Sequence, residues 1–548
     1  MKIPKFKIKL SLLDFVFVLF LLLAIFLRFY HFDRTYDWSA DNVRDFLVAK
    51  HIVVNHDFKW IAPWAFGSNN QMVNSVFYFY FLAVFYFFSF GNVFIYQLLV
   101  ALFFFITIII FSYLLAKLFF KEKIAVYITV LLFCFLPVAN VYGRSVFQPH
   151  FVLPFFFMSL YYYFSAFKRK SVRDLSLATF FYSITLNLHY SMLVILPWII
   201  GMMLYLQYKI EARSEKTFKW RVFFLSQFSW PSLILFLNFY FLILNQLIIR
   251  GFGRGFFSLG SFFNKVFLSS TSHVYLINFT SNFHVFVEGL LGYNNQLFFL
   301  VLLYSSIFLI FILFFLQKKT FYSLSLFLSL LCLPGVFLIT YYNGNLAYPS
   351  YYFSPFYLLL PAFLLSVLAS LSKKWRNVLL LTILFSFFAI YFEQFGKIKF
   401  IYNHDHIRQY QFVADLISND VKKNLPDHSD FFVFTIDDQL DWSSSKYWFY
   451  LEKNLQLSLV ETTWFRYNLV SAKKESRTIY LICDDPRVSW DSGRENWCLE
   501  RLENKDDFLV KEDVFLDEQK KLAIYRIVVS KPIERYSLYG LISSHNSN

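Results

Sequence analysis

Charged residues are scarce in this sequence, and acidic ones are scarcest before residue 397. Only 16% of the 548 residues are charged, and just 12 of the 36 Asp and Glu residues lie in that first part. Apolar residues make up 58% of the chain, and Phe alone occurs 77 times. A soluble globular protein carries more charge than this and fewer apolar residues, so the composition excludes that class.

Long apolar runs dominate the part of the sequence that is poor in charge. Runs of about 20 apolar residues recur as far as residue 395, and each can cross roughly 30 Å of hydrocarbon as an α-helix. The first run follows the basic segment MKIPKFKIK, and the two together resemble a signal sequence. No small-residue cleavage site follows, so we expect an uncleaved first span.

The net charge of +15 is compatible at first sight with nucleic-acid binding. The basic residues, however, form short clusters between apolar runs, which is typical of the cytoplasmic loops of membrane proteins. We therefore expect membrane lipid, and no nucleic acid, as a partner. Placing the clusters in the cytoplasm puts the N-terminus there too and gives about eleven spans. After a first span that ends near Phe29, they are predicted at 93–117, 124–142, 151–167, 174–188, 190–209, 222–249, 295–316, 321–341, 352–371 and 377–396.

The aromatic segment 72–91 can be placed in two ways. If it crosses the membrane, the clusters KLFFKEK (117–123) and FKRKSVR (167–173) fall outside the cytoplasm. If it lies in the membrane interface as a helix, both clusters are cytoplasmic. We predict the interfacial helix. The extracytoplasmic parts are then residues 29–92, 250–294 and everything from 397 onward.

Residues 397–548 differ in composition from residues 1–396, which indicates a separate domain. The later part holds 24 of the 36 acids, and residues 407–425 have the apolar period of a helix. Short apolar runs typical of strands occur at 431–436, 478–483 and 522–529. The predicted architecture is thus a polytopic helical membrane domain followed by a small extracytoplasmic α/β domain.

The four cysteines fall into two groups. Cys134 and Cys332 lie inside apolar runs, where we expect packing residues. Cys483 and Cys498 flank the polar stretch DDPRVSWDSGRENW in the predicted extracytoplasmic domain. Outside the cytoplasm these two could form a disulfide, and two unpaired thiols are the alternative.

The scarce acids concentrate in the first extracytoplasmic loop, where five of the twelve lie between Asp33 and Asp57. Within TYDWSADNVRDFLVAK (35–50), Ser39 can cap a helix that begins at Ala40. Its apolar residues recur at helical spacing, which favours a helix lying on the membrane surface. They are Val43, Phe46 and Leu47, followed by Lys50.

Asp41 is the candidate general base on this helix. Asp41 and Asp45 share a helix face, and Arg44 offsets part of their repulsion of a few tenths of a kcal/mol. A carboxylate held beside a cation at the membrane surface suits a base whose substrate is carried by a lipid. The alternative is that Asp41 merely stabilises the helix N-terminus. Asp33 and Asp57 are typical of ordinary loop acids.

A first span followed by an extracytoplasmic helix with the pattern D-[EQN]-x-R-[DY] resembles the GT-C glycosyltransferases that use polyprenyl-phosphate sugars. The resemblance is to the protein O-mannosyltransferase-like branch, which includes the lipid A aminoarabinose transferase. The family's catalytic Asp falls on Asp41 and its Arg on Arg44. Other similar stretches, in the same order along residues 10–396, are segment 72–91 ending in FG, YGRSVFQPHFVLPFFF (142–157), LNLHYSMLVILP (186–197) and SYYFSPFYLLLPAFLL (350–365).

The sequence also departs from this branch. Gln148 stands where the lipid A enzyme has a second acid, and Asn42 stands in the position usually held by Glu. The interfacial segment has Asn69, Asn70 and Gln71 where that enzyme has Lys. The comparison therefore implies a single base. We assign no metal ligand, and a divalent metal is possible but not indicated.

The resemblance implies an inverting transfer of a hexose or pentose from polyprenyl phosphate to a hydroxyl of a glycan, lipid or protein. The reaction would take place on the outer face of the plasma (inner) membrane. Asp41 would take the acceptor proton, and no cofactor beyond the lipid-linked donor is assigned. The residues expected to bind substrate or phosphate are Arg44, Asp45, Arg144, Gln148, His189, Arg250, Arg254, Tyr351 and Tyr352.

Structural roles are the alternatives for several of these residues. Arg250 and Arg254 could belong to a flexible Gly-rich loop, His189 could be a buried histidine, and the two tyrosines could form part of an aromatic belt. Two other classes of protein stay open for the whole chain, a membrane transporter and a non-catalytic envelope scaffold. A transporter favours ionisable residues deep in its spans.

Overall fold

The computed structural model contains two compact units, which are described separately. The helical unit comprises Met1–Tyr36 and His56–Asn403, and the second unit comprises Asp37–Asn55 and His404–Asn548. The structure describes residues 11–30, 32, 40–56, 77–189, 192, 195–211, 230–231, 233–234, 237, 356–369, 371–401, 406–425, 431–437, 445–455, 475–484, 508–517 and 522–534.

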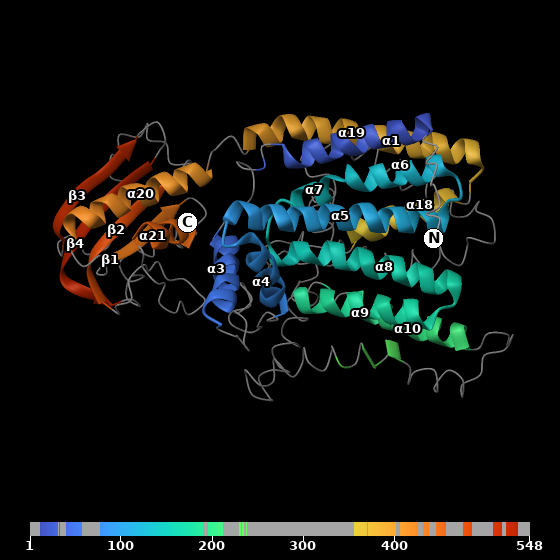
Figure 1. Ribbon diagram of the computed structural model, residues 1–548, viewed down its shortest axis with the longest axis horizontal. Coiled ribbons are helices and arrows are strands. Elements are labelled where there is room, and N and C mark those ends of the chain that lie inside the picture. The colour runs from blue at the N-terminus through green and yellow to red at the C-terminus, as the bar shows by residue number, and fades with distance from the viewer. Residues whose placement is uncertain are drawn as a thin grey trace, which may run out of the picture. The chain divides into compact units, whose positions relative to one another are not determined.

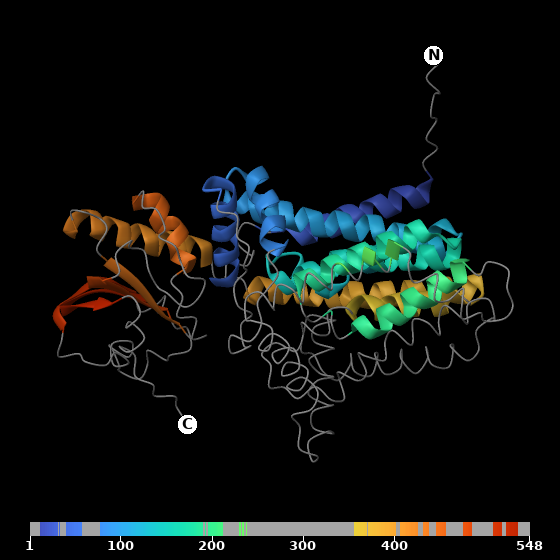
Figure 2. The same cartoon turned by 90° about the horizontal axis from the view of Figure 1, so that it is seen from below.

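Most helices of the helical unit run side by side (Figures 1 and 2). By length and composition, three helical stretches in its described part can cross a membrane: Leu12–Phe29, Val93–Phe119 and Gln148–Arg169. The described helices are α1 (Leu12–Phe29), α4 (Phe77–Ser89), α5 (Val93–Phe119), α6 (Lys123–Cys134), α7 (Pro137–Tyr142), the 3₁₀ helix η1 (Gln148–Phe151), α8 (Val152–Arg169), α9 (Val172–Leu188), α10 (Leu196–Glu211), α18 (Phe356–Ala369) and α19 (Lys373–Ile401).

Local polar caps fix where several of these helices begin. The Ser11 side chain accepts a hydrogen bond from the backbone N–H of Asp14, whose carboxylate accepts from the backbone N–H of Ser11, a reciprocal capping box. Asn92 caps α5 and Ser171 caps α9 by one-way hydrogen bonds, in which the side-chain oxygen accepts from a backbone N–H of the first turn. The predicted spans 93–117, 151–167, 174–188, 352–371 and 377–396 are confirmed as helices in their described parts.

Two predicted spans differ from the structure. The helix predicted over 124–142 is interrupted at Phe135 and Leu136 and continues as α7 from Pro137, since proline has no N–H for the helical ladder. The span predicted over 190–209 is α10, which begins only at Leu196. Segments 295–316 and 321–341 lie outside the described residues, as does most of 222–249.

Helix α4 is short and turns back at its end. Its 13 residues rise about 20 Å, which is less than the roughly 30 Å of a hydrocarbon core. In Figure 1 it runs across the direction of α5. Phe90 and Gly91, both with positive φ, form the turn into α5, and a Cβ at Gly91 would lie 3.1 Å from the Tyr86 hydroxyl. This length agrees with an interfacial helix over 72–91.

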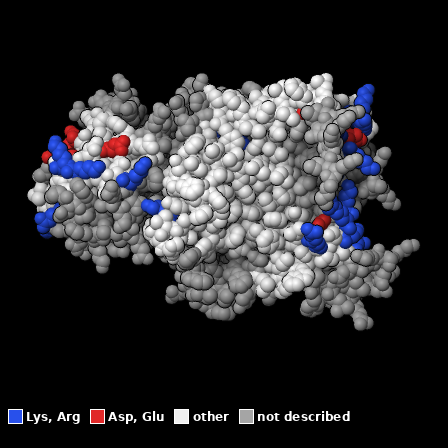
Figure 3. Space-filling view, viewed as in Figure 1, with Lys and Arg blue, Asp and Glu red and all other residues white. Residues whose placement is uncertain are grey.

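Lys and Arg side chains gather at one end of the helical unit (Figure 3). Contacts between loops that are distant in sequence place the clusters there together. The Lys168 ammonium donates to the Leu118 carbonyl at 2.8 Å, and the Arg376 guanidinium pairs with Glu122 at 2.7 Å. KLFFKEK, FKRKSVR and LSKKWR therefore share one end, as the predicted topology requires.

The second unit contains a four-stranded sheet with the order β1-β2-β4-β3. Strands β1 and β2 are parallel, and the other two neighbouring pairs are antiparallel. The predicted strands and the predicted helix are confirmed, whereas β3 was missed because charged residues interrupt its apolar pattern. The elements are α3 (Ala40–Val54), α20 (His406–Asn424), β1 (Phe431–Asp437), α21 (Ser445–Leu455), β2 (Glu475–Asp484), β3 (Phe508–Asp517) and β4 (Leu522–Glu534).

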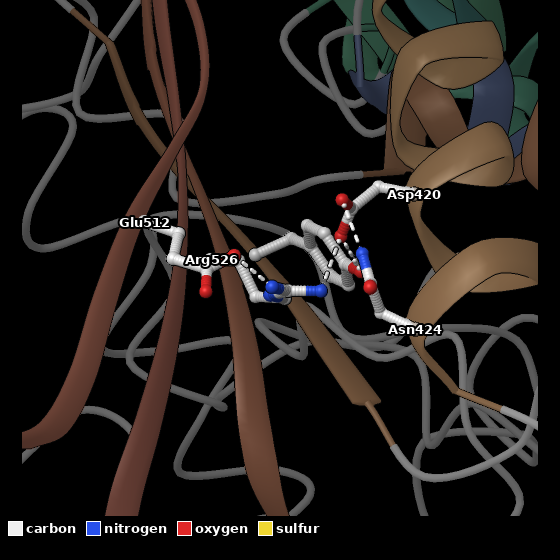
Figure 4. Close-up of polar contacts among 5 residues, drawn as sticks. Asp420, Asn424, Glu512 and Arg526 are labelled. Atoms are coloured by element: carbon white, nitrogen blue, oxygen red, sulfur yellow. Dashed lines mark hydrogen bonds and ion pairs between the residues drawn. The ribbon is translucent and has the colours of Figure 1, made fainter.

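A polar row ties α20 to this sheet (Figure 4). Arg526 is paired across the strands with Tyr480 on one side and Glu512 on the other. Asp420 of α20 accepts hydrogen bonds from the Tyr480 hydroxyl at 2.6 Å, the Arg526 guanidinium at 3.1 Å and the Asn424 amide at 2.7 Å. Burial, and then the bond to Asp420, raises the pKa of the Tyr480 phenol above its ordinary value.

The cysteines that the structure describes are in different states. Cys483, near the end of β2, is disulfide-bonded. Cys134 is a free thiol buried in α6. A disulfide is compatible with the extracytoplasmic location predicted for residues 397–548, because disulfides persist mainly outside reducing compartments.

Candidate functional site

Helix α3 carries the predicted base. It begins at Ala40, which confirms the start predicted from the Ser39 cap. The structure places the backbones of Asp41 and Arg44 in its first turns and does not describe their side chains. Asp45, one turn beyond Asp41, is fully buried with 0% exposure. On an α-helix these three positions lie on one face.

Burial of α3 extends beyond its apolar stripe. Val43 and Phe46 on the stripe are buried, and so are Asn42, Asp45 and Ala49 on other sides of the helix. Within the second unit, α3 packs against α21. The placement of α3 on the membrane surface stays a prediction. Packing against protein covers its polar side as well, which the apolar period alone could not indicate.

Arg144 lies in the turn between α7 and η1 and holds the end of α1. Its Nε donates to the Arg28 carbonyl at 2.9 Å. Its Nη2 donates to the same carbonyl at 2.5 Å, to Tyr30 at 2.9 Å and to Leu27 at 3.4 Å. The last carbonyls of a helix have no partner within the helix, and a cation suits the negative end of the helix dipole. Arg144 thus caps α1.

Arg28, in the last turn of α1, binds in turn the segment that leads to Arg144. It is fully buried, its Nη2 donates to the Ala139 carbonyl at 2.8 Å, and its guanidinium lies 5.3 Å from the Phe105 ring centroid. A Cβ at Gly143 would lie 1.7 Å from that Nη2, so only glycine leaves room for the arginine. We call the two arginines and the carbonyls they bind the arginine clasp. Sequence analysis missed Arg28, although an arginine inside an apolar span is a recognisable signal.

The turn that carries Arg144 is held from other directions too. The Gln148 amide donates to the Leu188 carbonyl of α9 at 2.5 Å. The Tyr78 hydroxyl of α4 donates to the Val146 carbonyl at 3.2 Å. Residues 143–151 are therefore bonded to α1, α4 and α9 at once. This polar anchoring fixes the turn to three helices at its end of the helical unit.

Histidines and tyrosines surround the same turn. The His150 ring stacks on Tyr142 at 4.0 Å between centroids, and Tyr142 lies against Tyr357 of α18 at 6.3 Å. His189 follows α9 directly, with an extended backbone and its N–H bonded to the Thr185 carbonyl at 3.1 Å. His150 and Tyr357 were not among the predicted site residues, since only folding brings their segments together.

The structure thus brings Arg144, Gln148 and His189 to one end of the helical unit. Arg144 and Gln148 donate to backbone carbonyls, and the backbone N–H of His189 bonds to the Thr185 carbonyl, so these residues help to shape this end. Within the described residues, no group of three His, Cys, Asp or Glu side chains could hold a metal ion. Arg250, Arg254, Tyr351 and Tyr352 lie outside the described residues. The meeting of Asp41 with Arg144 stays a prediction.

Comparison of the whole structure with solved structures adds to this picture. No protein-family model and no curated protein matches the sequence. The crystal structure of ArnT from Cupriavidus metallidurans bound to undecaprenyl phosphate is similar, with a TM-score of 0.57 over 95% of this chain and 99% of that one. The chain has the GT-C glycosyltransferase fold.

Two other solved structures are also similar to this chain. The apo state of the same ArnT gives a TM-score of 0.56 over 94% of this chain and 98% of that chain. Sequence identity is 12% in both comparisons. The archaeal oligosaccharyltransferase AglB from Archaeoglobus fulgidus, in complex with an inhibitory peptide and a dolichol-phosphate, is 11% identical and gives 0.45 over 86% of this chain and 69% of that one. At these identities the ArnT likeness establishes the fold alone.

Proposed function

We propose that this chain transfers a sugar from a polyprenyl-phosphate donor to a hydroxyl acceptor on the extracytoplasmic side of the membrane. One observation carries the proposal, the likeness over 95% of the chain to ArnT bound to undecaprenyl phosphate. A polyprenyl phosphate is the product that remains once such a donor has lost its sugar. The acceptor is a glycan, a lipid or a protein.

Asp41 acts as the general base in this proposal. Its carboxylate takes the proton of the acceptor hydroxyl as that oxygen attacks the anomeric carbon. The new carbon–oxygen bond forms on one face of the sugar while the bond to the phosphate oxygen breaks on the other, so the configuration inverts. Positioned bases of this kind contribute about 10²–10⁴-fold in rate. The first turn of α3 suits the role because a folded helix fixes the backbone from which the Asp41 side chain extends.

Cations stabilise the departing polyprenyl phosphate, which leaves with both bonding electrons. Arg44, one turn from Asp41, and Arg250 and Arg254 are the proposed phosphate ligands, because a guanidinium fork matches phosphate oxygens. Arg144 contributes its charge while its fork binds the end of α1. The remaining predicted substrate contacts, Asp45, Gln148, His189, Tyr351 and Tyr352, belong to the same proposal.

The proposed orientation places the basic end of the helical unit in the cytoplasm. Cytoplasmic loops are enriched in Lys and Arg, and the described clusters share one end. The disulfide at Cys483 supports an extracytoplasmic second unit. On this basis the enzyme is an integral protein of the plasma (inner) membrane with a cytoplasmic N-terminus.

The decisive experiment measures polyprenyl-phosphate release by the purified full chain in lipid vesicles. The donors are polyprenyl-phosphate hexoses and pentoses, and crude envelope supplies the acceptor. We expect Asp41→Asn to lower the release rate about 10²–10⁴-fold because the acceptor loses its base. Asp57→Asn, in the same loop, is the matched control and should keep the wild-type rate.

The possible results separate the proposal from its rivals. Release that Asp41→Asn leaves unchanged would retain the transferase and remove Asp41 as its base. No release from any donor would overturn the transferase and reopen the transporter and scaffold alternatives. Asp14 gives the transporter no support, because Lys123 at 2.5 Å and the Tyr127 hydroxyl at 2.6 Å already bind its carboxylate at the basic end.

A further inference from the structure

Three acidic side chains that the structure describes at the basic end of the helical unit are already paired. Asp14 binds Lys123, and Glu122 binds Arg376 at 2.7 Å. Asp174 accepts a hydrogen bond from the Ser165 hydroxyl and lies 3.9 Å from Arg169. These carboxylates therefore have little capacity left to neutralise the other cations around them.

Eight exposed cations remain at this end, and we call them the basic collar. Within the described part of the chain none of them forms an ion pair with a carboxylate. They come from the α5–α6 and α8–α9 connections and the helix ends beside them, from the last turn of α10 and from the start of α19. The members are Lys117, Lys121, Lys168, Lys170, Arg173, Lys209, Lys373 and Lys374.

Aromatic rings interleave with the collar. The ammonium groups of Lys117, Lys170 and Lys209 lie 4.5 Å, 5.0 Å and 5.8 Å from the ring centroids of Tyr113, Phe167 and Tyr205. The indole of Trp375 is 63% exposed in the same region. Aromatic side chains of this kind mark the boundary between hydrocarbon and headgroups. The collar therefore lies at the level of lipid phosphates.

Lys170 ends α8 and Lys209 lies in the last turn of α10, and both side chains are exposed. Burial, and then the neighbouring charge of Lys209, lowers the pKa of Lys170 below its ordinary value. Repulsion between ammonium groups is relieved when an anion binds near them.

The backbone of Lys170 supports a functional role for its side chain. Lys170 ends α8 in the left-handed region, with φ of +55° and ψ of +45°. Glycine is the usual residue at such a position, because any Cβ is disfavoured there. A lysine at this position costs helix-capping stability that glycine would provide.

We propose that the basic collar binds anionic phospholipid headgroups, with Lys170 and Lys209 among the lysines that contact their phosphates. The occupant is a lipid because the aromatic rings place the two ammonium groups at the membrane boundary. An anionic membrane surface attracts basic residues next to a span by a free energy that corresponds to about fivefold in affinity for each lysine. The inference does not depend on the proposed transferase activity.

The test compares thermal unfolding of the full chain in three preparations. These are phosphatidylcholine vesicles, the same vesicles with part of the lipid replaced by phosphatidylglycerol, and phosphatidylcholine vesicles with free glycerol phosphate. We expect phosphatidylglycerol to raise the Tm by roughly 2–4 °C. Added salt should reduce the rise, and glycerol phosphate should have no effect.

Two variants make the test specific. Lys170→Gly combined with Lys209→Gln should lose more than half of the phosphatidylglycerol-dependent rise. Lys170→Gly relieves the left-handed backbone, so the loss cannot be explained by a weaker fold in phosphatidylcholine alone. Lys423→Gln, an exposed lysine in the last turn of α20, is the matched control and should keep the full rise.

Four results would overturn the proposal. The Tm of the wild type could be the same with and without phosphatidylglycerol, or the double variant could keep the full rise. Free glycerol phosphate could give the same rise as the lipid, which would assign the site to a soluble anion. Finally, Lys423→Gln could lose as much as the double variant, which would reduce the effect to overall charge.

Discussion

The two ends of the helical unit use their cations in opposite ways. At one end Arg28 and Arg144 are turned inward and donate to backbone carbonyls, and Arg28 is fully buried. At the other end lysines dominate, and the eight cations of the basic collar stay exposed without an ion pair among the described residues. Guanidinium forks can cross-link backbone segments, whereas flexible ammonium groups suit a solvated or headgroup environment. Substitutions should therefore cost far more stability at the arginine end.

Gly143→Ala should have the largest effect on stability. The new Cβ would lie 1.7 Å from the Arg28 guanidinium and 3.0 Å from the Ala139 carbonyl. Displacing a fully buried arginine in this way should cost about 1–3 kcal/mol or more. Thermal unfolding in detergent measures the loss. Gly201→Ala is the matched control, since nothing lies within 4 Å of its Cβ position, and an unchanged Tm in both variants would contradict a tightly packed clasp.

Arg144→Lys should come next. Lysine keeps the charge and cannot reproduce a fork that binds the Arg28 carbonyl through two nitrogens. We expect a loss of about 1.5–3 kcal/mol, the range for hydrogen bonds that involve a charged group. Polyprenyl-phosphate release per folded molecule should be measured beside the Tm. Full stability with a lower rate would show that Arg144 serves substrate rather than α1.

Asp14→Asn tests the best-paired acid at the basic end. Asp14 is buried, whereas the Lys123 side chain is 52% exposed and its ion pair is weakened by solvent. We expect a lower free energy of unfolding, with a smaller loss than for Arg144→Lys, because the side chain loses its charge and its ion pair with Lys123. Tyr127→Phe removes one hydrogen bond to the same carboxylate without changing charge. A double-mutant cycle of the two should reveal coupling, and strictly additive losses would argue against a shared network.

Lys168→Gln should have the smallest effect. The side chain is exposed and its described hydrogen bond goes to the Leu118 carbonyl at a helix end. In phosphatidylcholine we expect a change within about 0.5 kcal/mol, as for most surface substitutions. Unfolding of this variant beside Arg144→Lys compares the two ends directly. A loss as large as that of Arg144→Lys would remove the contrast between them.

Features set by neighbouring residues were predictable from sequence. The Ser39 cap predicted the start of α3, and short apolar runs predicted β1, β2 and β4. The shared end of KLFFKEK and FKRKSVR followed from the preference of basic residues for one side of a membrane. The similarity of short motifs around Asp41 and Arg144 indicated a GT-C fold, which the comparison with ArnT supports.

Features that depend on distant segments were not predictable. The burial of Asn42 and Asp45 depends on what packs around α3, which a helical period does not contain. In the sequence Arg28 is only a charged residue at the end of a predicted span. Its acceptor, the Ala139 carbonyl, lies 111 residues away, so its structural role could not be predicted. The need for glycine at position 143 is evident only in the structure, where the Arg28 guanidinium occupies the space that a Cβ would fill. The break before Pro137 was visible in sequence, yet the apolar run continued through it.

Because the clasp joins residues 116 positions apart, it also sets an order for biosynthesis. The first span leaves the ribosome long before its cap has been made. At about 5–20 residues per second, Arg144 follows Arg28 by roughly 6–23 s. During that interval the terminal carbonyls of α1 must bind water or lipid headgroups. Final seating of the first helix is thus a late event, and a nascent chain halted before Ala139 should be extracted more readily by alkali than one halted after Phe151.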